Sequence, residues 1–196
     1  NSYNINTKKP SFVSESKLKG DKEKIKKTAN LISSSNKTVI IVGAGIKYNS
    51  KYKEIIKLAE FCNLPIVTAA GHGDAIPFNH KLHAGQMGPR GNPVASRLVK
   101  EANVILAIGT RLGFNSTFYS YENINKKAKI VHIELEKKML GKYFPIKIGI
   151  HADAATATKQ IYEQIKKNKI EIDVKNWTNL YLKERSKYLI DRDNNN

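Results

Sequence analysis

The alternation of hydrophobic and polar positions predicts strands and helices in turn along the chain. Near-continuous apolar runs, typical of strands buried on both faces, are each followed by a stretch with apolar residues on one helical side. The expected strands are 38–43, 64–70, 103–109, 129–135 and 145–153, and the expected helices are 21–36, 50–63, 92–102, 155–167 and 174–193. This order predicts an α/β protein with a parallel sheet covered by helices on both faces.

Capping residues mark two helix starts. Asp21 is the expected N-cap of the first helix, and Asn92 precedes Pro93, a residue favoured at the first helical position. The last helix has an apolar stripe of Trp177, Leu180, Tyr181, Tyr188 and Leu189. Two interpretations of this helix stay open: it packs on the same core, or it connects to a further domain.

The carboxyl ends of the expected strands carry polar and glycine residues. They are Gly43-Ala44-Gly45, Gly109-Thr110-Arg111, Glu134-Leu135-Glu136 and Asp153. Ligands of open parallel sheets bind beyond this edge. Glycine turns present backbone N–H groups to anions, an arginine can reach a phosphate, and a carboxylate can hold ribose hydroxyls. The set predicts a nucleotide site.

The first of these turns matches only part of a known fingerprint. In "TVIIVGAGIKYNS" (38–50) an apolar run ends in Gly43-Ala44-Gly45, but Tyr48 stands where the dinucleotide motif has its third glycine. The turn therefore either holds a diphosphate or is a purely structural tight turn.

Charge and cysteine content narrow the function classes. The net charge of +17 comes from 34 Lys and Arg against 17 Asp and Glu, but only five are arginine and the excess is spread along the chain. We expect a solvated basic surface and no nucleic-acid partner. A single cysteine, Cys62, excludes a disulfide framework and is expected in the core. No apolar run approaches the roughly 18 residues of a membrane span, so we expect a cytoplasmic protein without a membrane partner.

The segment 71–92 combines glycines with three histidines, His72, His80 and His83. Their spacing matches no zinc motif and acidic residues are sparse, so we assign no metal ligands. We expect a flexible, glycine-rich loop over the strand ends.

Several motifs together resemble the central domain of thiamine-diphosphate-dependent enzymes of the acetolactate synthase type. They are "PIVTAAGHGDAIPFNHKLHAGQMGPRGN", "EANVILAIGTRLGFNST" and, most specifically, "KIVHIELEKKMLGK". The resemblance implies a Rossmann-like (DHS-like) three-layer fold with a parallel sheet of about six strands. We expect a linker at 1–20, the domain at 21–170, and at 171–196 a helix or linker toward a missing domain.

The resemblance also implies ligand contacts. Expected at a diphosphate are Gly43, Ala44, Gly45, Gly109, Thr110 and Arg111. Expected near adenosine and its base are Glu134, Leu135, Asp153 and Ala154. Expected on the flavin side are Gln86, Met87 and Gly88. The synthases bind FAD here and oxalyl-CoA decarboxylase binds ADP. Because Leu112-Gly113-Phe114-Asn115 replaces the Asp-Asp-Arg pattern of the synthases, we expect ADP to bind at least as well as FAD.

The chemistry of that family lies outside this chain. The Gly-Asp-Gly…Asn-Asn motif for Mg²⁺ and thiamine diphosphate is absent, since "GHGD" at 71–74 lacks the continuation. We therefore expect no catalytic residues here. The parent enzyme is expected to be a homodimer or homotetramer that uses thiamine diphosphate and Mg²⁺ to decarboxylate a 2-oxo acid and transfer the remaining group to an acceptor.

Two alternatives remain open, and a third is disfavoured. The parent could instead be sulfoacetaldehyde acetyltransferase-like, or the chain could be a non-catalytic nucleotide-binding or interaction module. A sirtuin shares the opening Gly-Ala-Gly-Ile, but its continuation is missing and one cysteine cannot form the sirtuin zinc module.

Overall fold

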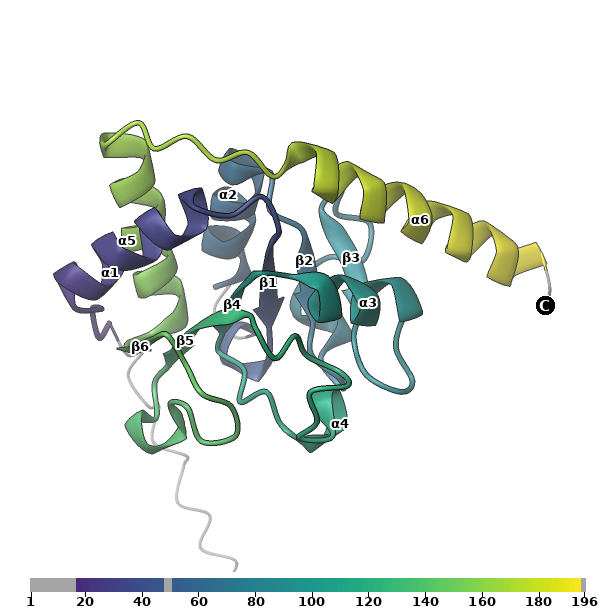
Figure 1. Ribbon diagram of the computed structural model, residues 1–196, viewed down its shortest axis with the longest axis horizontal. Coiled ribbons are helices and arrows are strands. Elements are labelled where there is room, and N and C mark those ends of the chain that lie inside the picture. Colours follow the sequence, from purple (N-terminus) through teal and green to yellow (C-terminus); the bar gives the residue numbers. More distant parts are fainter. Residues whose placement is uncertain (1–16, 48–50, 195–196) are drawn as a thin grey trace, which may run out of the picture.

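A six-stranded parallel sheet organises the computed structural model, which describes residues 17–47 and 51–194. The strands are β1 (Thr38–Val42), β2 (Ile66–Thr68), β3 (His83–Gln86), β4 (Val104–Ile108), β5 (Lys129–Glu134) and β6 (Ile148–His151). Their spatial order is β3-β2-β1-β4-β5-β6, and all neighbours run parallel (Figure 1). This is the Rossmann strand order, so the expected fold class is confirmed. Tyr48 lies outside the described residues.

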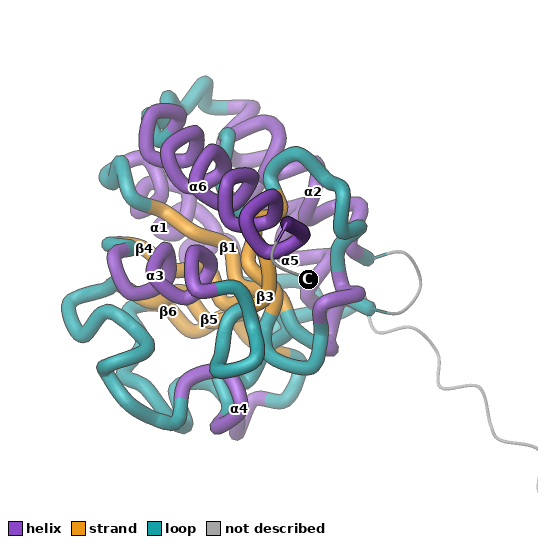
Figure 2. Tube along the Cα trace, turned by 90° about the vertical axis from the view of Figure 1, so that its right-hand side faces the viewer, coloured by secondary structure: helices purple, strands orange, loops and turns teal. Residues whose placement is uncertain are grey.

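Helices cover both faces of the sheet (Figure 2). They are α1 (Lys22–Ser33), α2 (Tyr52–Cys62), α3 (Pro93–Glu101), α5 (Ala154–Lys167) and α6 (Lys175–Asn194), whereas the one-turn helix α4 (Phe114–Thr117) lies beyond the carboxyl ends of the strands. Side chains alternate along β1: Ile40 and Val42 pack in the core under α1, α2 and α5, whereas Val39 and Ile41 pack in the core under α3 and α6. All four are fully buried, which explains the unbroken apolar run in the sequence.

The predicted caps form. The Asp21 carboxylate accepts a hydrogen bond from the Lys24 backbone N–H at 2.9 Å, and the Asn92 side chain accepts one from the Val94 N–H at 2.8 Å. Pro93 occupies the first turn of α3. Each cap satisfies one of the N–H groups that a helix start leaves without an intrahelical acceptor.

The expectation of a flexible loop over 71–92 is wrong in part. The segment contains the sheet-edge strand β3 and a 3₁₀ turn over Gly73–Ala75. Gly85 pairs with Val67 of β2 although its φ is +116°, and the register shifts just before this pair. The sequence signal is weak because a four-residue strand that includes glycine lacks the β-branched pattern of the central strands.

The first half of α6 packs on the core. Trp177 and Tyr181 are buried, and the Thr178 hydroxyl donates to the carbonyl of Asn63 at 2.7 Å. Leu180, by contrast, is 54% exposed, so the expected stripe covers the core only in part. Figure 1 shows the later turns of α6 continuing past the sheet toward the C-terminus.

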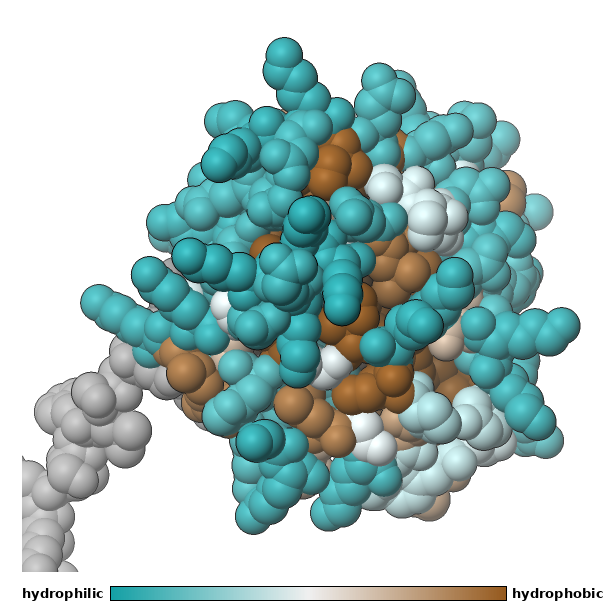
Figure 3. All heavy atoms as spheres, turned by 60° about the vertical axis from the view of Figure 1, so that its left-hand side comes forward, coloured by the Kyte–Doolittle hydropathy of each residue, from teal (hydrophilic) through white to brown (hydrophobic). Residues whose placement is uncertain are grey.

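The first described residues, just before α1, contact helix α5 and its N-cap. The Asp153 N–H donates to the carbonyl of Leu18 at 2.9 Å, and the Gly20 N–H donates to the Gln160 side chain at 2.8 Å. Figure 3 shows hydrophilic side chains covering most of one face, with hydrophobic ones between them. None of the helices in the described residues has the length and apolar character needed to cross a bilayer.

Candidate functional site

A cleft of about 600 Å³ opens beyond the carboxyl ends of β1 and β4, where the strand order reverses. The β1 arrow in Figure 1 points toward this side, on which α4 lies. Of the residues expected to contact a ligand, those that line the cleft are Ala44, Gly45, Gly109, Thr110, Arg111 and Glu134. Residues 69, 70, 72 and 113–116 complete the wall.

The glycines of the β1 and β4 turns lie against each other. The Gly45 N–H donates to the carbonyl of Gly109 at 2.9 Å, and a Cβ on Gly45 would lie 2.7 Å from the Gly109 Cα. A Cβ on Gly43 would lie 2.8 Å from the same carbonyl oxygen. Gly109 itself has a φ of +57°, a value that glycine adopts without strain. The glycines therefore allow the two turns to meet. Because the Gly45 N–H donates to the Gly109 carbonyl, it is not available to a ligand.

The backbone N–H of Ala44 is the donor that this turn leaves available. It has no backbone acceptor among the described residues, and Ala44 is exposed at the cleft. An anion in the cleft could accept this hydrogen bond.

Arg111 lies at the mouth of the cleft with its side chain 62% exposed. Its Nη2 atom is 3.3 Å from Oε2 of Glu136, and Lys138 is 2.7 Å from the other Glu136 oxygen. The hydrogen bond from Lys138, together with the charges of Lys138 and Arg111, holds the pKa of Glu136 below its usual value. Two cations, Arg111 and Lys138, therefore surround one carboxylate, Glu136, at the mouth of the cleft.

Glu134 lines the cleft, but one of its carboxylate oxygens is used locally. Oε1 accepts hydrogen bonds from the N–H groups of Leu135 at 2.9 Å and Glu136 at 3.2 Å. The two hydrogen bonds cap the turn after β5. The Leu135 side chain is 46% exposed. Leu135 does not line the cleft.

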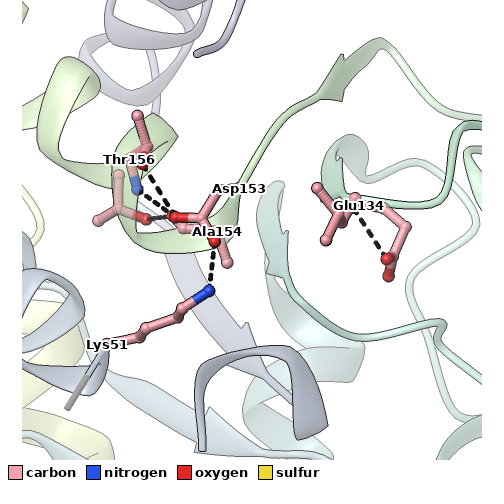
Figure 4. Close-up of polar contacts among 7 residues, drawn as sticks. Lys51, Glu134, Asp153, Ala154 and Thr156 are labelled. Carbon is pink, nitrogen blue, oxygen red and sulfur yellow. Dashed lines mark hydrogen bonds and ion pairs between the residues drawn. The ribbon is translucent and has the colours of Figure 1, made fainter. Parts of the chain in front are cut away.

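Asp153 is occupied as the N-cap of α5. Its Oδ1 accepts from the backbone N–H and the hydroxyl of Thr156, both at 2.9 Å, and its Oδ2 is 2.5 Å from Nζ of Lys51 (Figure 4). Burial alone would raise the pKa of Asp153, but the hydrogen bonds from Lys51 and Thr156 outweigh it and lower that pKa. Neither Asp153 nor the buried Ala154 lines the cleft.

The three residues expected on the flavin side do not line the cleft either. Met87 is 1% exposed, and its N–H donates to the carbonyl of Thr68 at 2.9 Å. Gly88, at a φ of +98°, packs behind the wall, because a Cβ there would lie 2.7 Å from the carbonyl oxygen of Asn115. Gln86 lines a separate pocket beside β3.

His132 is a structural residue that sequence reasoning missed. Its Nδ1 accepts from the Gly141 N–H at 3.3 Å, so its Nε2 carries the proton and donates to the carbonyl of Thr110 at 2.9 Å. Burial lowers the pKa of this imidazole. The ring links the turn after β4 to the loop after β5 through these two hydrogen bonds. The sequence feature that could have identified it is a histidine inside the apolar run "KIVHIEL".

The three histidines of 71–92 occupy different places. His72 lines the cleft, with a buried Nδ1 that has no partner among the described residues. His80 lies 3.5 Å from Glu60, and His83 is the buried first residue of β3. The described residues contain no cluster of three side chains able to hold a metal ion. Cys62 is in the core as expected, and burial raises its pKa to about 12.

Comparison with known proteins identifies the family. Residues 25–161 match the family described as thiamine pyrophosphate enzyme, central domain. The chain is 32% identical to the sulfoacetaldehyde acetyltransferase of Roseovarius nubinhibens over 163 residues, 82% of this chain and 27% of that protein. It is 30% identical to the probable acetolactate synthase large subunit of Methanococcus aeolicus over 146 residues, 74% of this chain and 24% of that protein.

The family match covers most of the sheet and the helices on both of its faces. The chain spans about a quarter of the length of the relatives above, so it corresponds to one region of larger proteins. It belongs to the thiamine pyrophosphate enzyme family, as a central domain of that family.

Proposed function

We propose that this chain is the central domain of a thiamine-diphosphate-dependent enzyme that transfers a two-carbon acyl group, and that its cleft binds an adenine nucleotide. The observation that carries the nucleotide proposal is the cleft at the strand-order reversal, where Arg111 lies at the mouth and the Ala44 N–H has no backbone acceptor in the described part of the chain. A backbone donor next to a guanidinium suits a diphosphate.

The cleft has further features that suit a nucleotide. Phe114 lines it with 52% of its surface exposed, so an aromatic face is available for a base. The buried Nδ1 of His72 lacks a partner among the described residues and could be satisfied by a ligand. Because the Asp-Asp-Arg pattern of FAD-binding synthases is absent, we propose ADP in preference to FAD.

We infer that thiamine diphosphate binds in another part of the parent, because the Gly-Asp-Gly…Asn-Asn motif that would hold its Mg²⁺ is absent from this sequence. When bound elsewhere in the parent, it supplies the carbanion chemistry of the reaction. For the parent we propose an acetolactate synthase-like reaction on a 2-oxo acid, with sulfoacetaldehyde acetyl transfer as the second candidate. The second candidate is kept because the chain is about as similar to a sulfoacetaldehyde acetyltransferase as to an acetolactate synthase large subunit.

Calorimetric titration of the 196-residue chain with ADP and with FAD tests the nucleotide proposal. We expect ADP to bind at least as well as FAD, with micromolar or weaker affinity, and Arg111→Ala to weaken ADP binding about tenfold through loss of a charge-assisted hydrogen bond. Arg97→Ala is the matched control, since Arg97 is also exposed but lies on α3, where it pairs with Glu101 and Glu184. Equal effects of the two substitutions would contradict the proposal.

A purely structural role is the competing function, and one observation favours it. Gly45 and Asp153 were expected to contact the ligand, but their hydrogen-bonding groups bind other residues of the fold. If neither nucleotide binds to the chain or to the full-length protein, the structural role is correct. Acetyl-group transfer assays of the full-length protein, with pyruvate or sulfoacetaldehyde as donor, separate the two parent reactions.

A further inference from the structure

A second pocket lies on the other side of the segment 85–92, between β3 and α6. Its volume is about 440 Å³, and it is separate from the cleft because the two share no lining residue. Figure 1 shows α6 running past β3 at the edge of the sheet. Of its lining residues only Gln86 was expected at a ligand, and a ligand in this pocket would bind independently of a nucleotide in the cleft.

The pocket contains buried polar groups without partners. His83 is 1% exposed, and neither of its ring nitrogens has a hydrogen-bond partner among the described residues. Burial, with a smaller contribution from Arg185, lowers the pKa of His83 to about 4, although the nearby carbonyls of Phe78 and Pro77 act in the opposite direction. The ring is therefore neutral at pH 7 and has one N–H to donate. Nε of Arg185 is also buried without an acceptor in the described part of the chain. Buried donors in native proteins are normally paired, so these two donors, which line the same pocket, are available to a ligand.

The charge of the pocket is strongly positive. Arg90, Arg185 and Arg192 line it, three of the five arginines in the chain. None of its lining residues is acidic, although Arg192 is paired with the neighbouring Asp193. Arg90 is exposed and makes no ion pair within the described residues. Such a concentration of guanidinium groups suits a dianion better than a single carboxylate.

The pocket also has an apolar wall. The Arg185 guanidinium lies over the Phe78 ring, with its carbon 5.0 Å from the ring centroid, and Nη2 donates to the Phe78 carbonyl at 3.1 Å. These contacts fix the position of Arg185 beside the His83 ring, which meets Phe78 edge to face at 6.2 Å. Tyr188 and Leu189 add apolar surface from α6.

We propose that this pocket binds a small phosphate monoester whose phosphate contacts Arg185, Arg90 and the His83 N–H and whose organic group packs on Phe78 and Tyr188. The phosphate satisfies the two buried donors, and its second negative charge uses the second arginine. The size of the pocket and its mixed lining are those of a small-molecule site.

Phenyl phosphate is the probe, observed through the ring ¹⁵N signals of His83 in the 196-residue chain at constant ionic strength. The His83 signals are assigned by their loss in His83→Gln. We expect a saturable shift of these signals, with benzoate binding more weakly and neutral benzyl alcohol giving no saturable shift. A linear response to phenyl phosphate, or equal saturation by benzyl alcohol, would overturn the proposal.

Three arginine variants locate the binding. Arg185→Ala should weaken phenyl phosphate binding about tenfold or more, and Arg90→Ala a few-fold, because Arg90 is exposed. Arg111→Ala, in the other cleft, should leave the His83 titration unchanged. Circular dichroism will show whether Arg185→Ala disturbs the fold. If it does, the Arg90→Ala variant tests the proposal, because unchanged phenyl phosphate binding in that variant rejects a phosphate site with two arginines. Weaker binding only in Arg111→Ala would place the anion in the cleft and also reject it.

Discussion

The centre and the flank of the sheet's carboxyl edge are built in different ways. At the centre, the turns after β1 and β4 meet through backbone alone, because Gly43, Gly45 and Gly109 have no side chains to separate them. At the flank, the ends of β5 and β6 are held by Glu134 and Asp153, whose carboxylates bind neighbouring N–H groups and a lysine.

The centre is therefore held by close backbone packing, and the flank by charged and hydrogen-bonded side chains. The central turns contain no titratable group within Gly43–Gly45, so their geometry depends on the space between two backbones. At the flank, the pKa values of Asp153 and His132 are both lowered, so we expect the stability of this region to depend on pH. We expect substitutions to be most damaging at the centre and pH to act mainly on the flank.

The largest effect is expected from Gly45→Ala. Its Cβ would lie 2.7 Å from the Gly109 Cα, and a backbone atom cannot give way as a flexible side chain can. We expect a loss of about 3 kcal/mol in the free energy of unfolding, measured by urea denaturation.

Gly113→Ala is the matched control for that substitution. Gly113 also lines the cleft, but a Cβ there would have no heavy atom within 4 Å, and its φ of −73° suits alanine. We expect a change within about 0.5 kcal/mol. Equal losses in the two variants would show that the central turns do not depend on close backbone approach.

Asp153→Ala should have the next largest effect. It removes the cap of α5 and leaves the amine of Lys51, whose side chain is 13% exposed, without its carboxylate. We expect a loss of about 2 kcal/mol in the free energy of unfolding, by urea denaturation. Asp21→Ala is the comparison, because Asp21 caps α1 without an ion pair, and its loss should be about 1 kcal/mol. A loss at Asp153 no larger than that at Asp21 would show that the lysine pair contributes nothing.

The pH dependence should separate His132 from Asp153. Burial lowers the pKa of His132 in the folded chain, so below the unfolded value of 6.5 the unfolded chain binds a proton that the folded chain does not. Stability is therefore complete above pH 6.5 and falls as the pH drops below it. Asp153, whose pKa is also lowered, stabilises the fold above 3.8 and loses this effect only at lower pH.

Urea unfolding at pH 7 and pH 5 measures this difference. His132→Gln should reduce the loss of stability between the two pH values without abolishing it, because the pKa values of His72 and His83 are lowered as well. An unchanged loss in His132→Gln would remove His132 from the pH response of the flank.

The smallest effect is expected from Glu136→Gln. Its ion pair with Arg111 is exposed, so the urea midpoint should not change measurably. The substitution releases Arg111 toward the cleft, and calorimetry should show ADP binding about twofold tighter. Glu163→Gln, in an exposed pair with Lys159 on α5, serves as the control with no change in ADP binding. Weaker ADP binding in Glu136→Gln would show that Glu136 itself contacts the ligand.

The sequence carried enough information for the central part of the fold. Strands such as β1 and β4 are buried on both faces and consist of β-branched and aliphatic residues, so their pattern is unambiguous. Strand β3 was missed because its pairing relies on backbone hydrogen bonds around Gly85 and His83, which have no apolar periodicity.

The ligand residues were less predictable for a physical reason. A strand-end residue can face the cleft or bind its own chain, and spacing does not distinguish the two. Glu134 and Asp153 have the same type of side chain at similar positions, yet only Glu134 lines the cleft, because Asp153 is held by Lys51, 102 residues away in the chain. That contact requires the folded arrangement of α2 and α5.

The hydrogen bonds between Gly20 and Gln160 also bear on the order in which the domain is assembled during synthesis. Within this domain, helix α1 leaves the ribosome before the strands and the other helices, but it packs on β6 and α5, which are made about 120 residues later. Non-local contacts of this kind form late, because a long loop must close first. Nascent chains that stop before β6 should therefore leave α1 open to proteases, and protection of α1 in such chains would show that it docks earlier.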